Sequence, residues 1–103
     1  VAAVTKGADG CWYRDHALGL GGRRQPAFRV KVVDTTGCGD VFHGVYAAAL
    51  ANGLDAPARI RYASAAAALK ATTKGGQAGI PRRAEIEAFL LRDKSGFDNV
   101  GPQ

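Results

Sequence analysis

The order of segments along the chain predicts an α/β fold. Three short apolar runs with the character of strands come first, a loop rich in glycine follows them, and three segments of helix-forming residues come next. Of the 103 residues, 47% are hydrophobic and 22% are charged. This is the composition of a globular protein and excludes a wholly disordered or collagen-like chain. A chain of this length has room for one domain.

The first part of the chain carries the predicted strands. Val1–Thr5 is a short apolar run typical of a buried strand, and Ala8-Asp9-Gly10 has the residues of a tight turn. We expect Cys11-Trp12-Tyr13 to return beside the first strand as a hairpin. Arg14–Gln25, with its glycines, is predicted to be a loop or an irregular ribbon. Phe28–Val33 is predicted to be the third strand, because apolar and basic residues alternate along it.

Two helices are predicted after the glycine-rich loop. Val41–Asn52 is rich in alanine and has no proline, and Gly53 suits the position just past a helix end. Asp55 can cap a second helix that has Pro57 near its first turn and runs from about residue 58 to 71.

A third helix is predicted at Arg82–Arg92, where apolar residues recur at helical spacing. A glycine-rich loop, Lys74–Gly79, precedes it, and Ser95–Gln103 has the polar composition of a tail. We find no internal repeat.

Several global features restrict the setting of the protein. The chain has no methionine and opens at Val1 inside an apolar run, so we expect a piece of a longer protein; a small protein that has lost its initiator methionine is the alternative. No apolar run approaches the ~20 residues of a membrane helix, and two cysteines do not make a disulfide framework. We therefore expect a cytoplasmic protein without a membrane partner. The net charge of +5 is spread along the chain, as on a solvated surface.

The segment Asp34–Asp40, with the sequence DTTGCGD, carries the chemistry. Gly37 and Gly39 lack a Cβ, so a ligand can approach the backbone closely. The helix that follows presents its first N–H groups and the positive end of its dipole, which suits a phosphate. Asp40 at the mouth of this site could accept the proton of a hydroxyl that attacks phosphorus. Alternatively, Asp40 only caps the helix and the glycines only form a turn.

Two common phosphate-binding motifs do not fit this segment. A P-loop needs lysine after its last glycine, where this chain has Asp40, and a dinucleotide fingerprint needs glycine where it has Phe42. The segment, continued by Val41-Phe42-His43-Gly44, instead resembles the C-terminal signature of the ribokinase-like (PfkB) carbohydrate kinases. The resemblance implies a three-layer α/β/α sandwich. Residues 1–94 would be its C-terminal, nucleotide-binding part and residues 95–103 a tail.

The same resemblance implies roles for individual residues. Asp40 would be the catalytic base, and Gly37, Cys38 and Gly39 would form the anion hole for the transferred phosphoryl group. Contacts with the nucleotide would come from Thr5, Gly7, Gly10, Ser64, Gly75 and Gly76. In many members a monovalent cation such as K⁺ is held near the equivalents of Asp34 and Thr36. Cys38 replaces the usual small residue, and at a helix N-terminus we expect its thiol pKa to be lowered.

The sequence therefore indicates an ATP-dependent sugar kinase that uses ATP with Mg²⁺, of which this chain carries the ATP-binding half and the base. In the family that this chain resembles, the residues that bind the sugar lie upstream of this region, so the resemblance implies that the fragment alone is inactive. One alternative is a kinase of the same fold that acts on a nucleoside or a hydroxymethyl-pyrimidine. Another is a basic module that binds an anion or nucleic acid without catalysis. The sugar-kinase interpretation implies ATP and a small sugar as partners, no nucleic acid, and a parent protein that could be a homodimer.

Overall fold

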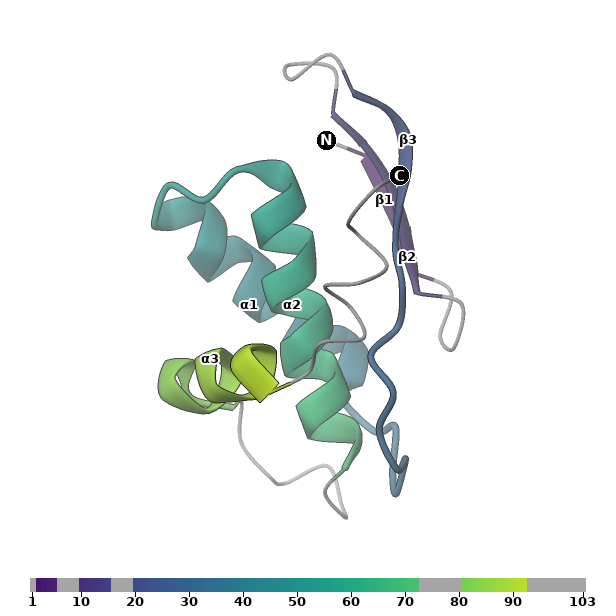
Figure 1. The fold of residues 1–103 in the computed structure, drawn as a ribbon, viewed down its shortest axis with the longest axis vertical. Helices are drawn as coiled ribbons and strands as arrows, with labels where there is room; N and C mark the ends of the chain where they lie inside the picture. Colours follow the sequence, from purple (N-terminus) through teal and green to yellow (C-terminus); the bar gives the residue numbers. More distant parts are fainter. Residues whose placement is uncertain (1, 6–9, 16–19, 73–80, 93–103) are drawn as a thin grey trace.

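A computed structural model describes residues 2–5, 10–15, 20–72 and 81–92. Its elements are β1 (Ala2–Thr5), β2 (Cys11–Asp15), β3 (Leu20–Gln25), α1 (Cys38–Ala51), α2 (Ala56–Ala71) and α3 (Arg83–Arg92). Figure 1 shows the sheet on one side and the helices on the other, with α2 next to the sheet. α2 also contacts both α1 and α3, so it is the central helix of the described part.

The described sheet is antiparallel, with the strand order β1-β2-β3. Its pairing of β1 with β2, in which Ala3 faces Tyr13, confirms the predicted hairpin. Neighbouring residues of β2 point to opposite faces: Tyr13 is buried, whereas Trp12 is 46% exposed. Ala3 is exposed as well. The prediction that the first strand is buried is therefore wrong at Ala3.

The third strand is not where the sequence pattern placed it. β3 lies at Leu20–Gln25, inside the stretch predicted to be a loop, because its backbone pairs with β2 in the register Cys11↔Gln25. Phe28–Val33 has no strand assignment. A strand needs a neighbouring backbone to pair with, and among the described residues no other strand pairs with this segment. Alternation of side chains alone could not show this.

The helices match the predicted ones in number and order, but their starts differ. α1 begins at Cys38, three residues before the predicted start, so Asp40 lies within its first turn and is not its cap. Gly53 follows the end of α1 with φ +83°, as predicted for a residue just past a helix. Asp55 caps α2, because its Oδ1 accepts the N–H of Ala58 at 3.0 Å.

Small side chains allow α1 and α2 to pack closely. Ala63, Ala65 and Ala66 of α2 are completely buried, as is Ile60. The rest of the core comes from all layers and consists of Cys11, Tyr13, Phe28, Val41, Phe42, Val45 and Ile86. Because alanine has only a methyl group, the two helix backbones can approach closely there, and larger side chains would force them apart.

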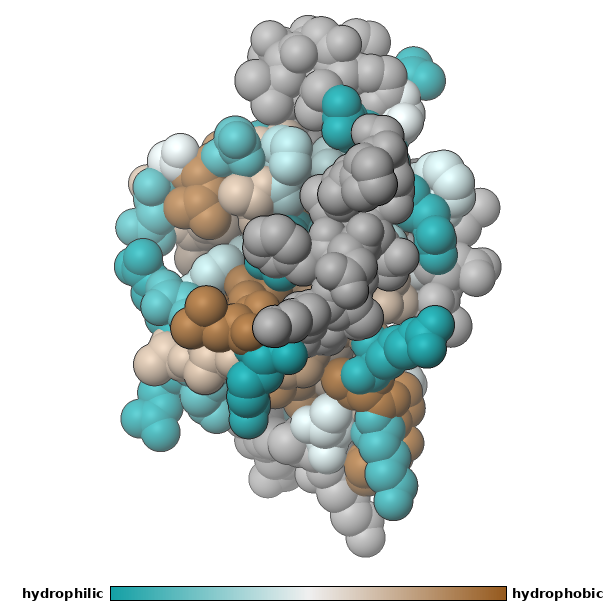
Figure 2. All heavy atoms as spheres, in the orientation of Figure 1, coloured by the Kyte–Doolittle hydropathy of each residue, from teal (hydrophilic) through white to brown (hydrophobic). Residues whose placement is uncertain are grey.

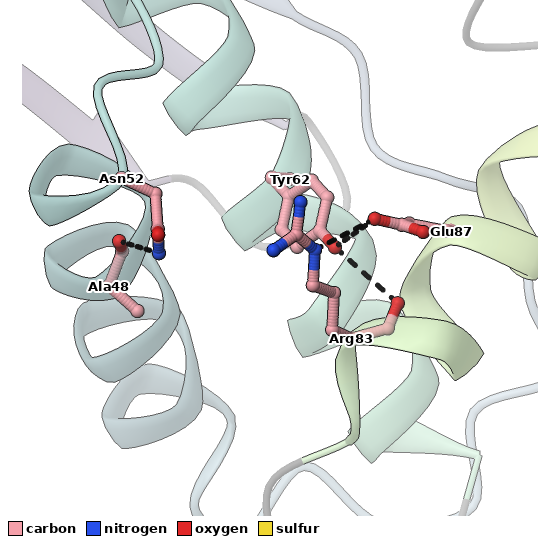
Figure 3. Close-up of polar contacts among 5 residues, drawn as sticks. All are labelled: Ala48, Asn52, Tyr62, Arg83 and Glu87. Atoms are coloured by element: carbon pink, nitrogen blue, oxygen red, sulfur yellow. Dashed lines mark hydrogen bonds and ion pairs between the residues drawn. The ribbon is translucent and has the colours of Figure 1, made fainter.

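α3 is attached to α2 with less burial. Ile86 is its only buried residue. The ring of Phe89 packs edge-on against Phe28, with 5.3 Å between centroids. The hydroxyl of Tyr62 lies 3.4 Å from both the Arg83 carbonyl oxygen and Glu87 Oε1 (Figure 3), and burial is the main cause that raises the pKa of this tyrosine.

Some apolar side chains remain on the surface. Figure 2 shows brown, hydrophobic side chains over α3 and over the extended segment that follows β3. Val32 and Val33 in that segment are more than half exposed, and Leu91 of α3 is 81% exposed. In the described part of the chain, no helix has the length and apolar character needed to cross a membrane.

Candidate functional site

The first turn of α1 is open at its N-terminus. Gly37 occupies the N-cap position with φ +79°, and no side chain caps the helix. The Cys38 N–H donates to the Thr35 carbonyl at 3.2 Å, and the Val41 N–H to the Gly37 carbonyl at 3.0 Å. Among the described residues, no backbone carbonyl outside the helix accepts the N–H of Gly39 or Asp40. Two amides at the positive end of the helix dipole therefore remain open to a ligand.

The space around this turn is also open. Apart from its chain neighbours and the backbone of its own helix, a Cβ on Gly39 would meet no described atom within 4 Å. Asp40, the acidic residue of the first turn, is exposed. A negative side chain is favourable at this end of a helix whether or not it takes part in a reaction. The geometry thus leaves a carboxylate and free amides beside an unfilled space.

The loop before α1 is anchored to the C-terminal end of α2. The N–H groups of Val33 and Asp34 both donate to the Ala71 carbonyl, at 2.8 and 3.1 Å. Asp34 Oδ1 in turn accepts the N–H of Thr36 at 2.8 Å, which closes a tight turn. The two residues expected near a monovalent cation therefore lie in one turn, at the meeting point of two helix ends.

Cys38 is held against α2. Its Sγ donates to the Ala67 carbonyl at 3.5 Å. Burial raises the pKa of this thiol, an effect that the positive charge of Lys70 opposes and the negative charge of Asp34 reinforces. The thiol pKa is therefore raised and not lowered as expected, because loss of hydration on burial is the largest cause of its shift.

Lys70 is a site neighbour that the sequence reasoning missed. Its side chain is only 4% exposed although it carries an ammonium group. Its Cε lies 3.6 Å from the position that a Cβ on Gly37 would take. A lysine within the alanine-rich run of α2 was the available signal, since buried lysines are rare.

The remaining predicted nucleotide contacts are spread over the chain. Thr5 ends β1, and Ser64 is half-buried on α2, three residues before Ala67 and so on the same side of the helix. Gly10 has a structural requirement of its own: its φ is +92°, and a Cβ there would lie 2.8 Å from the Ala27 nitrogen. The predicted contacts at Gly7, Gly75 and Gly76 lie outside the described residues.

The described residues include acidic, cysteine and histidine side chains, which are common metal ligands. They contain no group of three or more His, Cys, Asp or Glu side chains that could hold a metal ion. Asp34 and Asp40 are thus not part of such a cluster within the described ranges.

Several solved structures that this chain resembles are described as kinases. The ribokinase of Arabidopsis thaliana, complexed with ribose and ATP, matches with a TM-score of 0.76 and 31% identity over 85% of this chain and 28% of that chain. A candidate ribokinase II of E. coli, in complex with ATP and Mg²⁺, matches with a TM-score of 0.75 and 35% identity over 84% and 27%. The nucleoside kinase of Burkholderia thailandensis, in complex with inosine, matches with a TM-score of 0.75 and 36% identity over 93% of this chain and 30% of that chain. The predicted ribokinase-like α/β fold is therefore confirmed.

The comparison of sequences also relates this chain to kinases. The model of the pfkB family carbohydrate kinases matches residues 1–83, and the chain belongs to this family. It is 48% identical over 65 residues to the ribokinase of Bacillus subtilis, covering 63% of this chain and 22% of that protein. It is 39% identical over 87 residues to the ribokinase of Lactococcus lactis, covering 84% of this chain and 28% of that protein. The chain thus spans less than a third of the length of these relatives.

Proposed function

We propose that the full-length protein containing this chain transfers a phosphoryl group from ATP to a sugar hydroxyl. In this proposal the chain supplies the phosphate end of the nucleotide site and the catalytic base. The observation that carries it is the open first turn of α1, where among the described residues no backbone carbonyl outside the helix accepts the Gly39 and Asp40 amides and Asp40 is exposed. Membership of a carbohydrate kinase family supports it independently.

Each residue of the turn has a distinct task in this proposal. The backbone of Gly37, Cys38 and Gly39 lets the γ-phosphate approach, and amides and helix dipole stabilise the negative charge on its oxygens. Asp40 accepts the proton of the attacking hydroxyl. The new bond joins that oxygen to the γ-phosphorus, the bond from the γ-phosphorus to the bridging oxygen breaks, and ADP leaves.

Magnesium enters as the counter-ion of ATP, as in the E. coli relative complexed with both. We further propose that the Asp34–Thr36 turn supplies oxygen ligands to a monovalent cation. A carboxylate oxygen and backbone carbonyls are the donors that hard cations prefer.

The nucleotide contacts assigned to Thr5, Gly7, Gly10, Ser64, Gly75 and Gly76 are part of the same proposal. At Gly10 the requirement for glycine already has a structural explanation, namely the close approach of the backbone at Ala27. Substitution there would disturb the fold and would not test nucleotide binding. Ser64→Ala is the more informative change, because the side chain is only half-buried on a helix.

The direct test is a coupled assay of ATP consumption by the purified full-length protein, with ribose, fructose and inosine as acceptors. We expect turnover with a sugar. Because a nucleoside kinase is also similar to this chain over 93% of its length, turnover with inosine alone would assign the protein to that second class. If no acceptor of a broad panel supported ATP consumption, the result would contradict the proposal.

The 103-residue chain tested alone in the same assay should show little or no sugar-dependent turnover. Phosphoryl transfer requires both reactants to be held in line, and this chain accounts for less than a third of the length of its relatives. Full activity of the isolated chain would show that the acceptor site also lies within it.

A further inference from the structure

We propose that the outer face of the sheet is a docking surface for a segment of a partner protein that is acidic and carries an apolar side chain. The surface, here called the Trp12 face, consists of Trp12 and Arg14 of β2 and Arg24 of β3. It goes beyond the proposed kinase function, because none of these residues belongs to the DTTGCGD segment or to α1.

The pairing of the strands places the three side chains on one face. Trp12 lies directly opposite Arg24, and residues paired in this way point to the same side of an antiparallel sheet. Arg14 follows Trp12 by two positions, and both residues pair with β1 in one continuous register. Because side chains two positions apart on a strand share a face, both arginines lie on the face of the indole ring.

No described helix covers this face. The helices lie on the other side of the sheet (Figure 1), where α2 contacts β2 and β3. Cys11 and Tyr13, the neighbours of Trp12 along β2, point to that side and are buried, whereas Trp12 is 46% exposed. Arg14 and Arg24 are exposed as well. The described part of the chain therefore leaves a large aromatic side chain and two guanidinium groups accessible together.

The exposed indole ring has a defined neighbour. The guanidinium carbon of Arg24 lies 5.9 Å from the centroid of the Trp12 ring, within the range of a cation–π interaction. A side chain that is already oriented loses less conformational entropy when a partner binds. Tryptophan and arginine are also among the residues in which the binding energy of protein interfaces is concentrated. The Trp12 face thus has the composition expected at the centre of an interface.

The charge of the face determines the chemistry of the partner. Both of its described charged residues, Arg14 and Arg24, are positive. Arg24 is engaged with the ring, whereas the Arg14 side chain makes no hydrogen bond or ion pair among the described residues. A second copy of the chain would bring a further net charge of +5, which opposes contact. A segment that places a carboxylate beside Arg14 and an apolar side chain against Trp12 complements both features.

The test uses the full-length protein and a fluorescent synthetic peptide in which glutamate alternates with leucine. Its reference is a peptide of the same length in which lysine replaces glutamate, and fluorescence anisotropy measures both affinities. We expect saturable binding of the glutamate peptide, on the order of 10-fold tighter than that of the lysine peptide, because like charges at an interface repel. Added salt should weaken this binding, since it screens exposed charges.

Two substitutions assign the binding to the Trp12 face. Trp12→Ala and Arg14→Glu should each weaken binding of the glutamate peptide by about 10-fold, since one removes a central aromatic contact and the other reverses a charge. The matched controls are Leu91→Ala and Arg92→Glu, which change an exposed apolar and an exposed basic residue of α3. These controls should leave the affinity unchanged.

Absence of binding, equal affinity for the two peptides, or equal weakening by the control variants would each overturn the proposal. Melting temperatures separate loss of a contact from loss of the fold, and they should stay at the wild-type value because all four substituted side chains are exposed. If Trp12→Ala nevertheless unfolds, Arg14→Glu decides the outcome. None of these measurements depends on phosphoryl transfer, so the failure of this proposal and that of the proposed function are separate observations.

Discussion

The N-termini of α1 and α2 begin in opposite ways. α2 is closed by its own sequence: the Asp55 side chain accepts the Ala58 N–H, and Pro57 at the second position has no N–H to satisfy. α1 begins at Gly37, which offers no side-chain cap, and the Gly39 and Asp40 amides stay open. The difference agrees with our proposal that the start of α1 binds a ligand, whereas the start of α2 is closed by its own residues.

The largest expected effect follows from removing the carboxylate at the open end. Asp40→Asn in the full-length protein should lower turnover by about 10²–10⁴-fold while MgATP affinity stays similar, because only proton transfer is lost. Steady-state kinetics and calorimetry measure the two quantities. Near-normal turnover would mean that Asp40 serves only the helix dipole, and the contrast between α1 and α2 would lose its catalytic meaning.

The next effect concerns the space at the open end. Apart from its chain neighbours and its own helix backbone, a Cβ on Gly39 would meet no described atom within 4 Å. Gly39→Ala should therefore leave the melting temperature unchanged or raised, since alanine is the better helix former. Turnover should nevertheless fall on the order of 10²-fold, because a shift of the phosphate by about 1 Å is that costly. Reduced stability together with normal turnover would contradict a ligand at this place.

At the capped N-terminus of α2, a substitution should reduce stability and leave turnover unchanged. Asp55→Ala removes the α2 cap and should lower the free energy of unfolding by about 1 kcal/mol. Turnover per folded molecule should not change, because the cap lies at the opposite end of α2 from the Ala71 anchor. Chemical denaturation and kinetics on the same sample check both. A loss of turnover greater than the loss of folded protein would mean that the two helix starts are coupled.

The smallest effect is a dependence of stability on alkaline pH. Burial raises the pKa of Cys11 and Cys38 above the ordinary thiol value of 9.0, so the folded state favours the protonated thiols. Their contribution is fully present below pH 9.0 and is lost as the pH rises through the raised values. Melting temperatures measured from pH 7 to 10 should fall less steeply for Cys11→Ala than for wild type. Identical slopes would show that the buried thiol of β2 does not contribute.

Local features of the site could be predicted from the sequence. The DTTGCGD segment, the cap at Asp55 and the glycine after α1 were all identified, because each depends on the conformation of a few neighbouring residues. The predicted start of α1 was three residues too late. Glycine is a poor helix former, so the first turn of the helix had the composition of a loop. Family membership also follows from this local motif and its context.

Pairing and packing were decided only by the tertiary structure. β3 lies in a stretch with the composition of a loop, and Phe28–Val33 lacks a partner strand among the described residues, because a strand is defined by a backbone distant in sequence. The raised pKa of Cys38 and the place of Lys70 beside Gly37 arise likewise from the contact of α1 with α2. The sequence by itself determined which backbone could receive a phosphate. The packing of the two helices decided which side chains surround it, because burial and charge there depend on residues some thirty positions apart.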